Sequence, residues 1–228
     1  MATRKEQLWA RHHALLEEER ALWARGLTRV GGLDEAGAGP WAGPVMAACV
    51  VVAPEATDAL IGVFDSKQLS AKKRTELAAL IKEAALASEV AEASVEEIDT
   101  LNIRRAGLLA MERALLAVEA KLGPLEYLLL DARTLALARP QRAIIKGDAK
   151  SISIAAASIL AKVTRDALMT KAAERYPEYG FEQHKGYGTA AHKKALARFG
   201  ACPIHRRSFE PVREASGGPP DQRELFSS

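Results

Sequence analysis

The feature that most limits what this chain can fold into is a set of short, continuous apolar runs lying between longer helical segments. The runs are GPVMAACVVVA at 43–53, LEYLLLDA at 125–132 and RAIIKGDAK at 142–150. The runs at 125–132 and 142–150 are typical of central strands that are covered on both faces, and the run at 43–53 is also predicted to be a strand. A further strand is predicted at 28–36, joined to 43–53 by a connection rich in Gly and Pro. This order predicts an α/β fold with a mixed sheet, in which a leading hairpin is followed by strands alternating with helices.

Helical segments are predicted between and around these strands. Apolar positions recur at helical spacing over 5–26, and the segments 95–123 and 151–176 show the same pattern. A helix over 70–88 begins at a Ser that can act as its N-cap. We expect a break near 101–102 and a short helix near 189–199.

Composition excludes several classes of protein. The 228 residues are 48% hydrophobic, enough for one core, and the net charge of +3 suits an acidic partner without requiring one. Cys49 and Cys202 form neither a disulfide framework nor a zinc-binding spacing. The N-terminus lacks the apolar stretch of a signal peptide, and no run approaches the roughly 18 apolar residues of a membrane span. We therefore expect a soluble, cytoplasmic protein without membrane contact.

Acidic residues stand where several predicted strands end. Asp34 and Glu35 close the first strand, Asp131 closes the run at 125–132, and Asp148 follows the next run. Acids at the ends of adjacent strands can converge, and a cluster of carboxylates stays ionised only beside cations. Oxygen ligands indicate Mg²⁺ or Mn²⁺ rather than Zn²⁺, and two such ions can drive phosphodiester hydrolysis. Each acid taken alone is more typical of a loop or cap residue. The spacing of the acids alone therefore does not decide whether they form a metal site.

The segment GLDEAGAGPWAGPV at 32–45 contains a Gly-x-Gly sequence that superficially matches a dinucleotide-binding turn. That turn requires a helix directly after the glycines, whereas Pro40 and Pro44 intervene here and a strand follows. The remaining interpretation is a loop whose backbone a ligand can approach closely, because Gly37 and Gly39 lack side chains.

Seven segments together resemble the type 2 ribonuclease H family, the bacterial ribonuclease HII proteins. They occur in the family's order and cover most of residues 28–212. The segments are GLDEAGAGPWAGPV (32–45), DSKQLSAKKRTEL (65–77), LNIRRAGLLAMERAL (101–115), LLLDA (128–132), KGDAKSISIAAASILAKVTRD (146–166), HKGYGTAAH (184–192) and HRRSFEPV (205–212).

The resemblance implies a ribonuclease H-like fold with a five-stranded mixed sheet flanked by helices and a small C-terminal helical extension. We expect an N-terminal helix packed on the domain at 1–27 and a catalytic core at 28–176. A substrate-contacting segment is expected at 177–214, and a disordered tail at 215–228.

The resemblance also implies a divalent-metal endonuclease. Such an enzyme hydrolyses RNA in RNA–DNA hybrids and incises duplex DNA 5′ of single embedded ribonucleotides, leaving 3′-hydroxyl and 5′-phosphate ends, in replication and repair. Asp34, Glu35, Asp131 and Asp148 match the family's four acidic positions and would hold two Mn²⁺ or Mg²⁺ ions, with Asp34 bridging both. Asp166 competes for the fourth position, but its place inside a predicted helix favours Asp148.

Substrate contacts are implied for the glycine-rich turn and for one tyrosine. The backbone of Gly37–Ala38–Gly39 would contact the ribose 2′-hydroxyl, and Tyr187 would stack on the sugar of the next deoxynucleotide. The family usually has Arg where this chain has Ala38, so a phosphate contact of roughly 1.5–3 kcal/mol is missing. Lys67 and Arg133 are candidates to replace it.

Basic residues in the matched segments are predicted to contact backbone phosphates, which position a duplex without reading its sequence. They are Lys67, Lys146, Lys150, Lys185, Lys193, Lys194, Arg206 and Arg207.

Two other functions fit parts of the pattern. A relative that binds hybrids without cutting is disfavoured by the intact acidic positions. A phosphatase built on a strand-end Asp would be expected to carry an Asp-x-Asp pattern, which is absent here. We expect a monomer that binds RNA–DNA hybrid and ribonucleotide-containing duplex DNA. The tail at 215–228 could contact a clamp-like partner, although a frayed end is the favoured interpretation.

Overall fold

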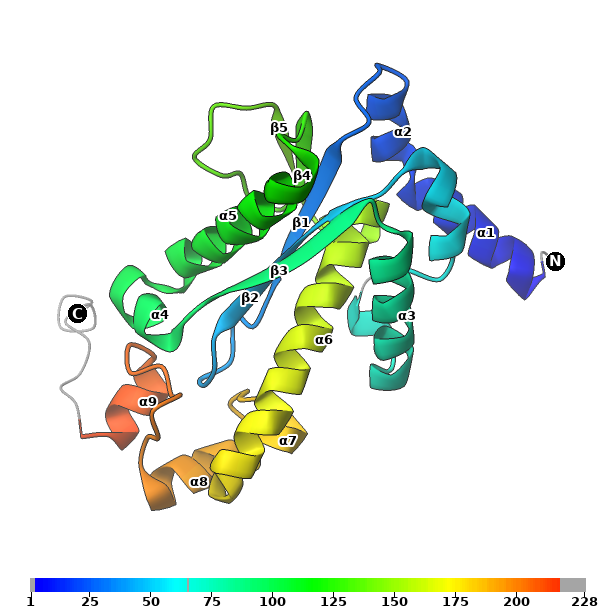
Figure 1. The fold of residues 1–228 in the computed structure, drawn as a ribbon. Helices are drawn as coiled ribbons and strands as arrows, with labels where there is room; N and C mark the ends of the chain where they lie inside the picture. Colours follow the sequence, from blue (N-terminus) through cyan, green and yellow to red (C-terminus); the bar gives the residue numbers. More distant parts are fainter. Residues whose placement is uncertain (1–2, 65, 218–228) are drawn as a thin grey trace, which may run out of the picture. The chain divides into compact units, whose positions relative to one another are not determined.

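The computed structural model describes residues 3–64 and 66–217 and contains a five-stranded sheet in the order β3-β2-β1-β4-β5. The strands are β1 (Val30–Ala36), β2 (Val45–Val51), β3 (Ala87–Ala93), β4 (Tyr127–Asp131) and β5 (Gln141–Ile144). The helices are α1 (Arg4–Leu15), α2 (Glu17–Trp23), α3 (Ala71–Ala84), α4 (Val95–Leu101), α5 (Ile103–Leu122), α6 (Ile152–Arg175), α7 (Phe181–His184), α8 (Ala190–Phe199) and α9 (Glu210–Ala215). Figure 1 shows these elements.

The sheet is mixed, as predicted. β1 pairs antiparallel with β2 and parallel with β4, and β4 pairs parallel with β5. The fully buried β2 and the apolar centre of β4 match the apolar runs of the sequence. The predicted fold class, a five-stranded mixed sheet flanked by helices, is confirmed.

The chain divides into two compact units. The first comprises Met1–Ala36, Met46–Glu92 and Leu108–Val163, and the second comprises Gly37–Val45, Ala93–Gly107 and Thr164–Ser228. The domain boundaries predicted at residues 27, 176 and 214 stay predictions. The sheet lies in the first unit apart from the terminal residues Val45 and Ala93.

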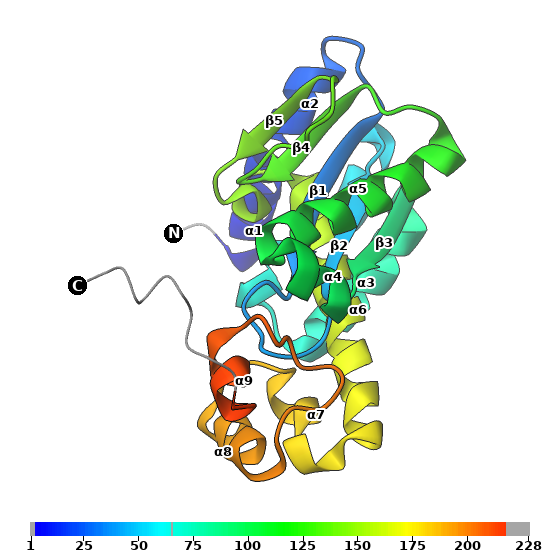
Figure 2. The ribbon, with the colours of Figure 1, turned by 90° about the vertical axis from the view of Figure 1, so that its left-hand side faces the viewer.

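Within the first unit, helices cover both faces of the sheet. Figures 1 and 2 show α5 over one face and α1, α3 and α6 over the other. Apolar side chains of α1, α3 and α6 form a buried cluster with β2, including Leu15, Leu77 and Ile159 beside Val50. At Gly32 in β1, a Cβ atom would lie 2.3 Å from the backbone of Ser153, so only Gly lets α6 approach this closely.

The second unit has a small core of its own. Met169 and Ala173 of α6 pack with Tyr179, Phe181 and Cys202. The Tyr179 and Phe181 rings are stacked with their centroids 5.3 Å apart. This core supports the connections between α6 and α9.

Three details differ from or refine the sequence predictions. The N-terminal helix predicted over 5–26 is two helices with a break at Leu16, and the end of the segment predicted as a helix over 70–88 begins strand β3. The break predicted near 101–102 is confirmed, because Asn102 has φ 71° and separates α4 from α5. Most of the tail predicted as disordered, 218–228, lies outside the described residues. No helix in the described part of the chain is both long and apolar enough to cross a membrane.

Candidate active site

Strand register brings two of the predicted acidic residues together. β1 and β4 run parallel with Leu33 opposite Leu130, so the next residues, Asp34 and Asp131, are neighbours on adjacent strands. Paired residues of neighbouring strands point to the same face, and this pairing explains why acids far apart in sequence converge. Asp34 is only 5% exposed, so this carboxylate is buried where β1 pairs with β4.

A short 3₁₀ helix, η3 (Gly147–Ala149), carries Asp148 into the same region. The Gly147 N–H donates to Asp131 Oδ1 at 2.7 Å and ties this turn to the end of β4. Two non-glycine residues with positive φ flank these acids, Ala132 at 55° and Lys146 at 57°. Such backbone conformations cost about 1–3 kcal/mol each and gather at functional sites.

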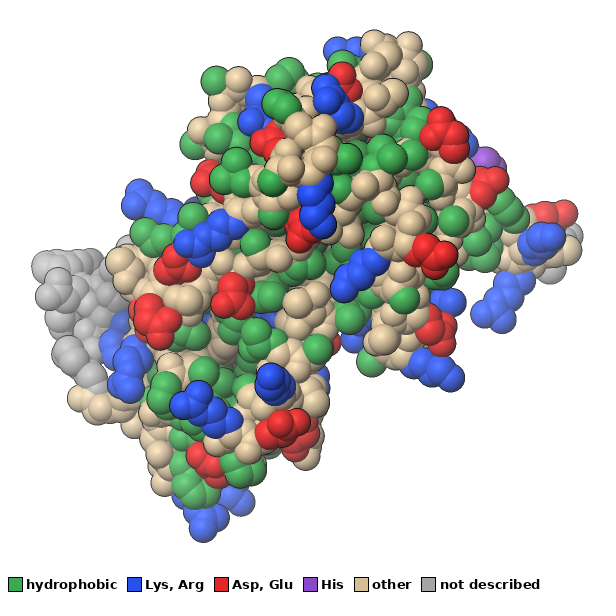
Figure 3. Space-filling view, in the orientation of Figure 1, with side chains coloured by type: hydrophobic (Ala, Val, Ile, Leu, Met, Phe, Trp, Pro, Cys, Tyr) green, Lys and Arg blue, Asp and Glu red, His purple; other side chains and the backbone are tan. Residues whose placement is uncertain are grey.

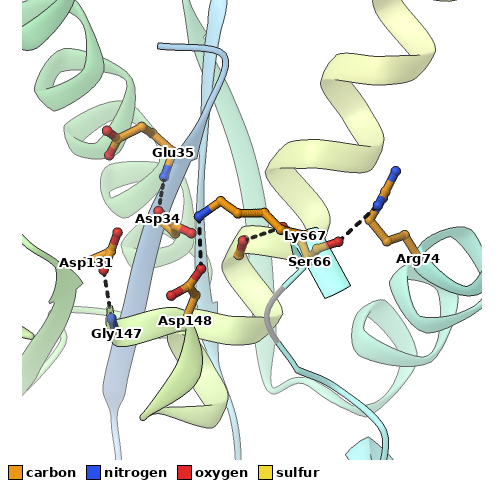
Figure 4. A network of polar contacts seen from close by, with 9 residues as sticks. Asp34, Glu35, Ser66, Lys67, Arg74, Asp131, Gly147 and Asp148 are labelled. Carbon is orange, nitrogen blue, oxygen red and sulfur yellow. Dashed lines mark hydrogen bonds and ion pairs between the residues drawn. The ribbon is translucent and has the colours of Figure 1, made fainter. Parts of the chain in front are cut away.

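Two cationic side chains lie beside the carboxylates. Lys67 Nζ is 3.3 Å from Asp148 Oδ2, and Arg133 Nη1 is 3.7 Å from Glu35 Oε1. Figure 4 shows the Lys67 ammonium group bonded to Asp148, Asp131 bonded to Gly147, and the Glu35 side chain extending away from that of Asp34. Successive residues of a strand point to opposite faces, so this separation follows from the strand.

The acids perturb one another electrostatically. Burial, with Asp131 and Glu35 close by, raises the pKa of Asp34 well above its usual value, and a hydrogen bond with Ser158 opposes this only in part. Burial also raises the pKa of Glu35, where Arg133 and Lys67 oppose the effect and Asp131 adds to it. A divalent cation would favour the ionised forms of these carboxylates.

The donor chemistry of this cluster fits a hard divalent cation. Its carboxylate oxygens are the ligands that Mg²⁺ and Mn²⁺ prefer, and the raised pKa of Asp34 marks a place short of positive charge. Across residues 3–64 and 66–217, however, no three His, Cys, Asp or Glu side chains are arranged so that they could hold one ion as they stand. The side chains therefore have to gather further around a cation.

The residues predicted to contact the sugars, Gly37–Ala38–Gly39 and Tyr187, lie in the second unit. Gly37 is buried with φ 97°, while Ala38 and Gly39 are exposed. Tyr187 is 42% exposed, and its Cε1 would lie 3.9 Å from a Cβ atom placed on Gly39. The structure thus brings the tyrosine beside the glycine-rich turn, although the two are far apart in sequence.

The predicted phosphate contacts differ in their availability. Lys146 and Lys67 are exposed, although Lys67 is also paired with Asp148. Lys185 Nζ donates to Thr170 Oγ1 at 2.9 Å and also to the Glu182 carbonyl. The prediction for Arg206 is wrong, because its side chain is 0% exposed and donates to backbone carbonyls instead. On the face drawn in Figure 3, basic and acidic side chains of the described residues are interspersed.

Sequence reasoning missed several polar residues that support these sites. Ser158 bonds Asp34, and its hydroxyl lies 2.9 Å from that of Ser66. His192 Nδ1 lies 2.9 Å from the Tyr187 carbonyl oxygen. Ser158 lies among small residues of a predicted Ala-rich helix, and nothing in that pattern indicates a polar role. The His192 contact depends on tertiary structure. Asp166, the competitor of Asp148, belongs to the second unit, whereas Asp34, Asp131 and Asp148 belong to the first.

Comparisons with known proteins agree on one family. The family model described as ribonuclease HII matches residues 31–212. Ribonuclease HII of Anaeromyxobacter sp. (strain Fw109-5) is 53% identical over 227 residues, which cover 99% of this chain and 70% of the relative. Ribonuclease HII of Halorhodospira halophila is 54% identical over 197 residues, which cover 86% of this chain and 98% of the relative. The resemblance inferred from the seven segments is thereby confirmed.

Solved structures show the same fold. The crystal structure of ribonuclease H2 from Pyrococcus horikoshii is 28% identical with a TM-score of 0.71, covering 82% of this chain and 97% of that one. The PCNA:RNase HII complex from Archaeoglobus fulgidus is 25% identical with a TM-score of 0.61, covering 87% and 95%. Bst-RNase HIII in complex with Mn²⁺, at 21% identity and a TM-score of 0.69 over 86% and 72%, shares the fold.

Proposed function

The chain belongs to the ribonuclease HII family and is a ribonuclease H endonuclease, and from this premise we propose that it is metal-dependent and incises 5′ of single ribonucleotides in duplex DNA. It also hydrolyses the RNA strand of RNA–DNA hybrids. In the cell this activity removes ribonucleotides during DNA replication and repair.

The observation that carries the proposal is the convergence of Asp34 and Asp131 through the parallel register of β1 and β4. The turn that holds Asp148 is bonded to Asp131 in the same unit. The strand register and this hydrogen bond support a common role for the three acids, and the pKa of Asp34 is raised by burial and by its neighbours Asp131 and Glu35. A solvated loop acid would show neither feature.

We assign the binding of two divalent ions, Mn²⁺ or Mg²⁺, to Asp34, Glu35, Asp131 and Asp148. Bound ions of this kind lower the pKa of an attacking water and stabilise a departing oxygen. Lys67 lies against Asp148 and holds positive charge there, so this side chain offers a partner for a phosphate oxygen when Asp148 turns to a cation. Arg133 has the same relation to Glu35.

Recognition of the ribonucleotide is assigned to the second unit. The exposed residues Ala38 and Gly39 offer backbone groups that can bond a 2′-hydroxyl, which is the group that distinguishes RNA from DNA at one nucleotide. The half-exposed ring of Tyr187 offers a flat surface for the neighbouring deoxyribose. In the sequence, Gly37 follows Glu35 by two residues, so one short segment carries both a proposed metal ligand and the turn proposed to contact the ribose.

The reaction is a hydrolysis. The hydroxyl of a water molecule forms a bond to phosphorus on the 5′ side of the ribonucleotide, and the bond from phosphorus to the preceding 3′-oxygen breaks. The 3′-oxygen takes up a proton, so the products carry a 3′-hydroxyl and a 5′-phosphate.

A duplex with one embedded ribonucleotide tests the proposal. It is incubated with the protein and Mn²⁺, Mg²⁺ or EDTA, beside an all-DNA duplex of the same sequence, and the product ends are mapped by mass spectrometry. We expect a nick 5′ of the ribonucleotide with at least one of the metals and none with EDTA. Retained binding without a nick under either metal would instead favour a protein that recognises hybrids without cutting.

The Archaeoglobus relative was solved as a complex with PCNA. The clamp contact considered for this chain rests on a tail whose residues 218–228 lie outside the described part. It stays a prediction.

A further inference from the structure

Two arginines of the second unit, Arg165 and Arg206, are both 0% exposed. Arg is rarely buried completely, because its charge loses hydration unless good partners replace the water. Among the described residues, neither guanidinium forms an ion pair with a carboxylate; both donate to backbone carbonyls. The identity of those carbonyls indicates what the two arginines do.

Arg206 binds both ends of the glycine-rich loop that follows β1. Its Nη2 donates to the Gly37 carbonyl at 2.6 Å and its Nη1 to the Ala38 carbonyl at 3.0 Å. Its Nε donates to the Gly43 carbonyl at 2.8 Å, and Nη2 also lies 3.2 Å from the Pro44 carbonyl. One planar group therefore closes the loop 37–44 by holding its start and its finish.

Arg165 joins this loop to the segment that carries Tyr187. Its Nε donates to the Pro44 carbonyl at 3.1 Å and its Nη2 to the Ala42 carbonyl at 2.9 Å. Its Nη1 donates to the Lys185 carbonyl at 3.0 Å. The guanidinium thus spans the loop and the Lys185–Tyr187 backbone.

Close backbone packing strengthens this junction. The Trp41 N–H donates to the Gly186 carbonyl at 2.8 Å, and a Cβ atom on Gly186 would lie 2.6 Å from the Ala42 carbonyl oxygen. A Cβ atom on Gly188 would lie 2.2 Å from the Trp41 ring. The two segments are therefore in contact, and glycines permit that contact.

Holding two like charges side by side in a buried place is unfavourable. Burial lowers the pKa of Arg206 to about 9, with Arg165 contributing. A buried charged group is weak evidence for stability but can specify one arrangement of the chain. Here Arg206 specifies the conformation of the loop 37–44, and Arg165 specifies how that loop lies against 185–187.

We propose that Arg165 and Arg206 are positioning residues for ribonucleotide recognition: they fix the glycine-rich loop against the Tyr187 segment so that both face one sugar–phosphate junction. This inference rests on the proposed function. The two side chains do not contact substrate, since both are buried. They act through Gly37, Ala38 and Lys185, whose carbonyls they hold.

The test uses Arg165→Lys and Arg206→Lys in the full-length protein. Lysine keeps the charge but cannot serve several carbonyls in one plane. Arg198→Lys makes the same chemical change at an exposed position of α8 and is the matched control. Binding is measured by fluorescence anisotropy in EDTA, with a duplex carrying one ribonucleotide and with the all-DNA duplex. Amide hydrogen exchange follows residues 37–44 and 185–187.

For each lysine variant we expect the preference for the ribonucleotide duplex, the ratio of the two Kd values, to fall about tenfold. The amides of both segments should exchange faster, while those of β1 and β4 are unchanged. The control should match the wild type in both measurements. A folded lysine variant with the wild-type ratio and wild-type exchange at 37–44 would overturn the proposal.

Failure of the proposed function is distinguishable from failure of this inference. If the wild type shows no preference for the ribonucleotide duplex, the proposed recognition is wrong, but hydrogen exchange still reports whether the arginines hold the two segments together. If both lysine variants fail to fold, amide hydrogen exchange in the wild type decides whether the two segments are held together. Protection of 37–44 and 185–187 with one common opening free energy supports the inference, and independent opening of the two segments refutes it.

Discussion

Replacing Glu19 with Ala should destabilise the protein strongly, although Glu19 is not among the predicted site residues. Glu19 belongs to α2 and is 1% exposed. Its Oε1 accepts hydrogen bonds from the Ser151 hydroxyl at 2.5 Å and from the Ser153 N–H at 3.1 Å and hydroxyl. Because α6 begins at Ile152, this carboxylate caps the helix from another segment of the chain.

The magnitude follows from the donors left behind. Glu19→Ala removes one acceptor shared by three buried donors, and each unsatisfied buried donor costs about 1–3 kcal/mol. The two hydroxyls lie 3.2 Å apart and can bond each other, which recovers part of the loss. We expect a decrease of about 3–4 kcal/mol in the free energy of unfolding.

Urea unfolding followed by circular dichroism measures this change, with Glu17→Ala as the matched control. Glu17 is an exposed residue of the same first turn of α2, so its loss should cost about 0.3–1 kcal/mol through the helix dipole. Glu19→Gln should fall between the two, because burial already raises the pKa of Glu19 and the amide keeps one acceptor oxygen. If Glu19→Ala and Glu17→Ala gave the same free energy, the capping role would be refuted.

Three further predictions concern the loop and the acids. Gly37→Ala should cost about 1–3 kcal/mol in urea unfolding, since φ is 97° and the new Cβ would lie 2.1 Å from Arg165 Nε, whereas Gly39→Ala should stay within about 0.5 kcal/mol. Equal values for the two would contradict the packing described. Because the pKa of Asp34 is raised in the folded protein, the protonated side chain stabilises the fold. This contribution is fully present below the ordinary Asp pKa of 3.8 and is lost as the pH rises through the folded-state pKa. Asp34→Asn should therefore raise the melting temperature of the EDTA-treated protein at neutral pH, and should raise it by less at acidic pH. A melting temperature below that of the wild type at neutral pH would refute this. Ala38→Arg should lower KM for the ribonucleotide duplex about tenfold by restoring a phosphate contact, and an unchanged KM would show that the absent arginine costs nothing.

Elements with strong local signals were predictable from the sequence. The apolar runs gave β2 and β4, and the helical pattern gave α5 and α6. Strand β3, one of the two edge strands, was missed because its mostly half-exposed residues look like the end of the preceding helix, whereas the other edge strand, β5, was predicted as a strand but lies at an edge rather than in the centre of the sheet. Edge strands carry less of the apolar signal on which prediction depends.

Some residues of the candidate site were likewise predictable from the sequence, and others were not. Asp34 and Asp131 could be named from motifs, and their convergence follows from parallel strands. The roles of Arg165, Arg206 and Glu19 could not be inferred, since a charged residue in sequence is ordinarily a solvated one. Which distant carbonyls or hydroxyls meet such a group is decided by tertiary packing alone.

Mn²⁺ titration followed by electron paramagnetic resonance tests most directly whether acids from separate segments gather around a divalent ion. Asp34→Asn is compared with the wild type and with Asp58→Asn, which changes an exposed acid of the same unit. We expect Asp34→Asn to weaken Mn²⁺ binding at least about tenfold and Asp58→Asn to leave it unchanged. Wild-type affinity for Mn²⁺ in Asp34→Asn would contradict this expectation.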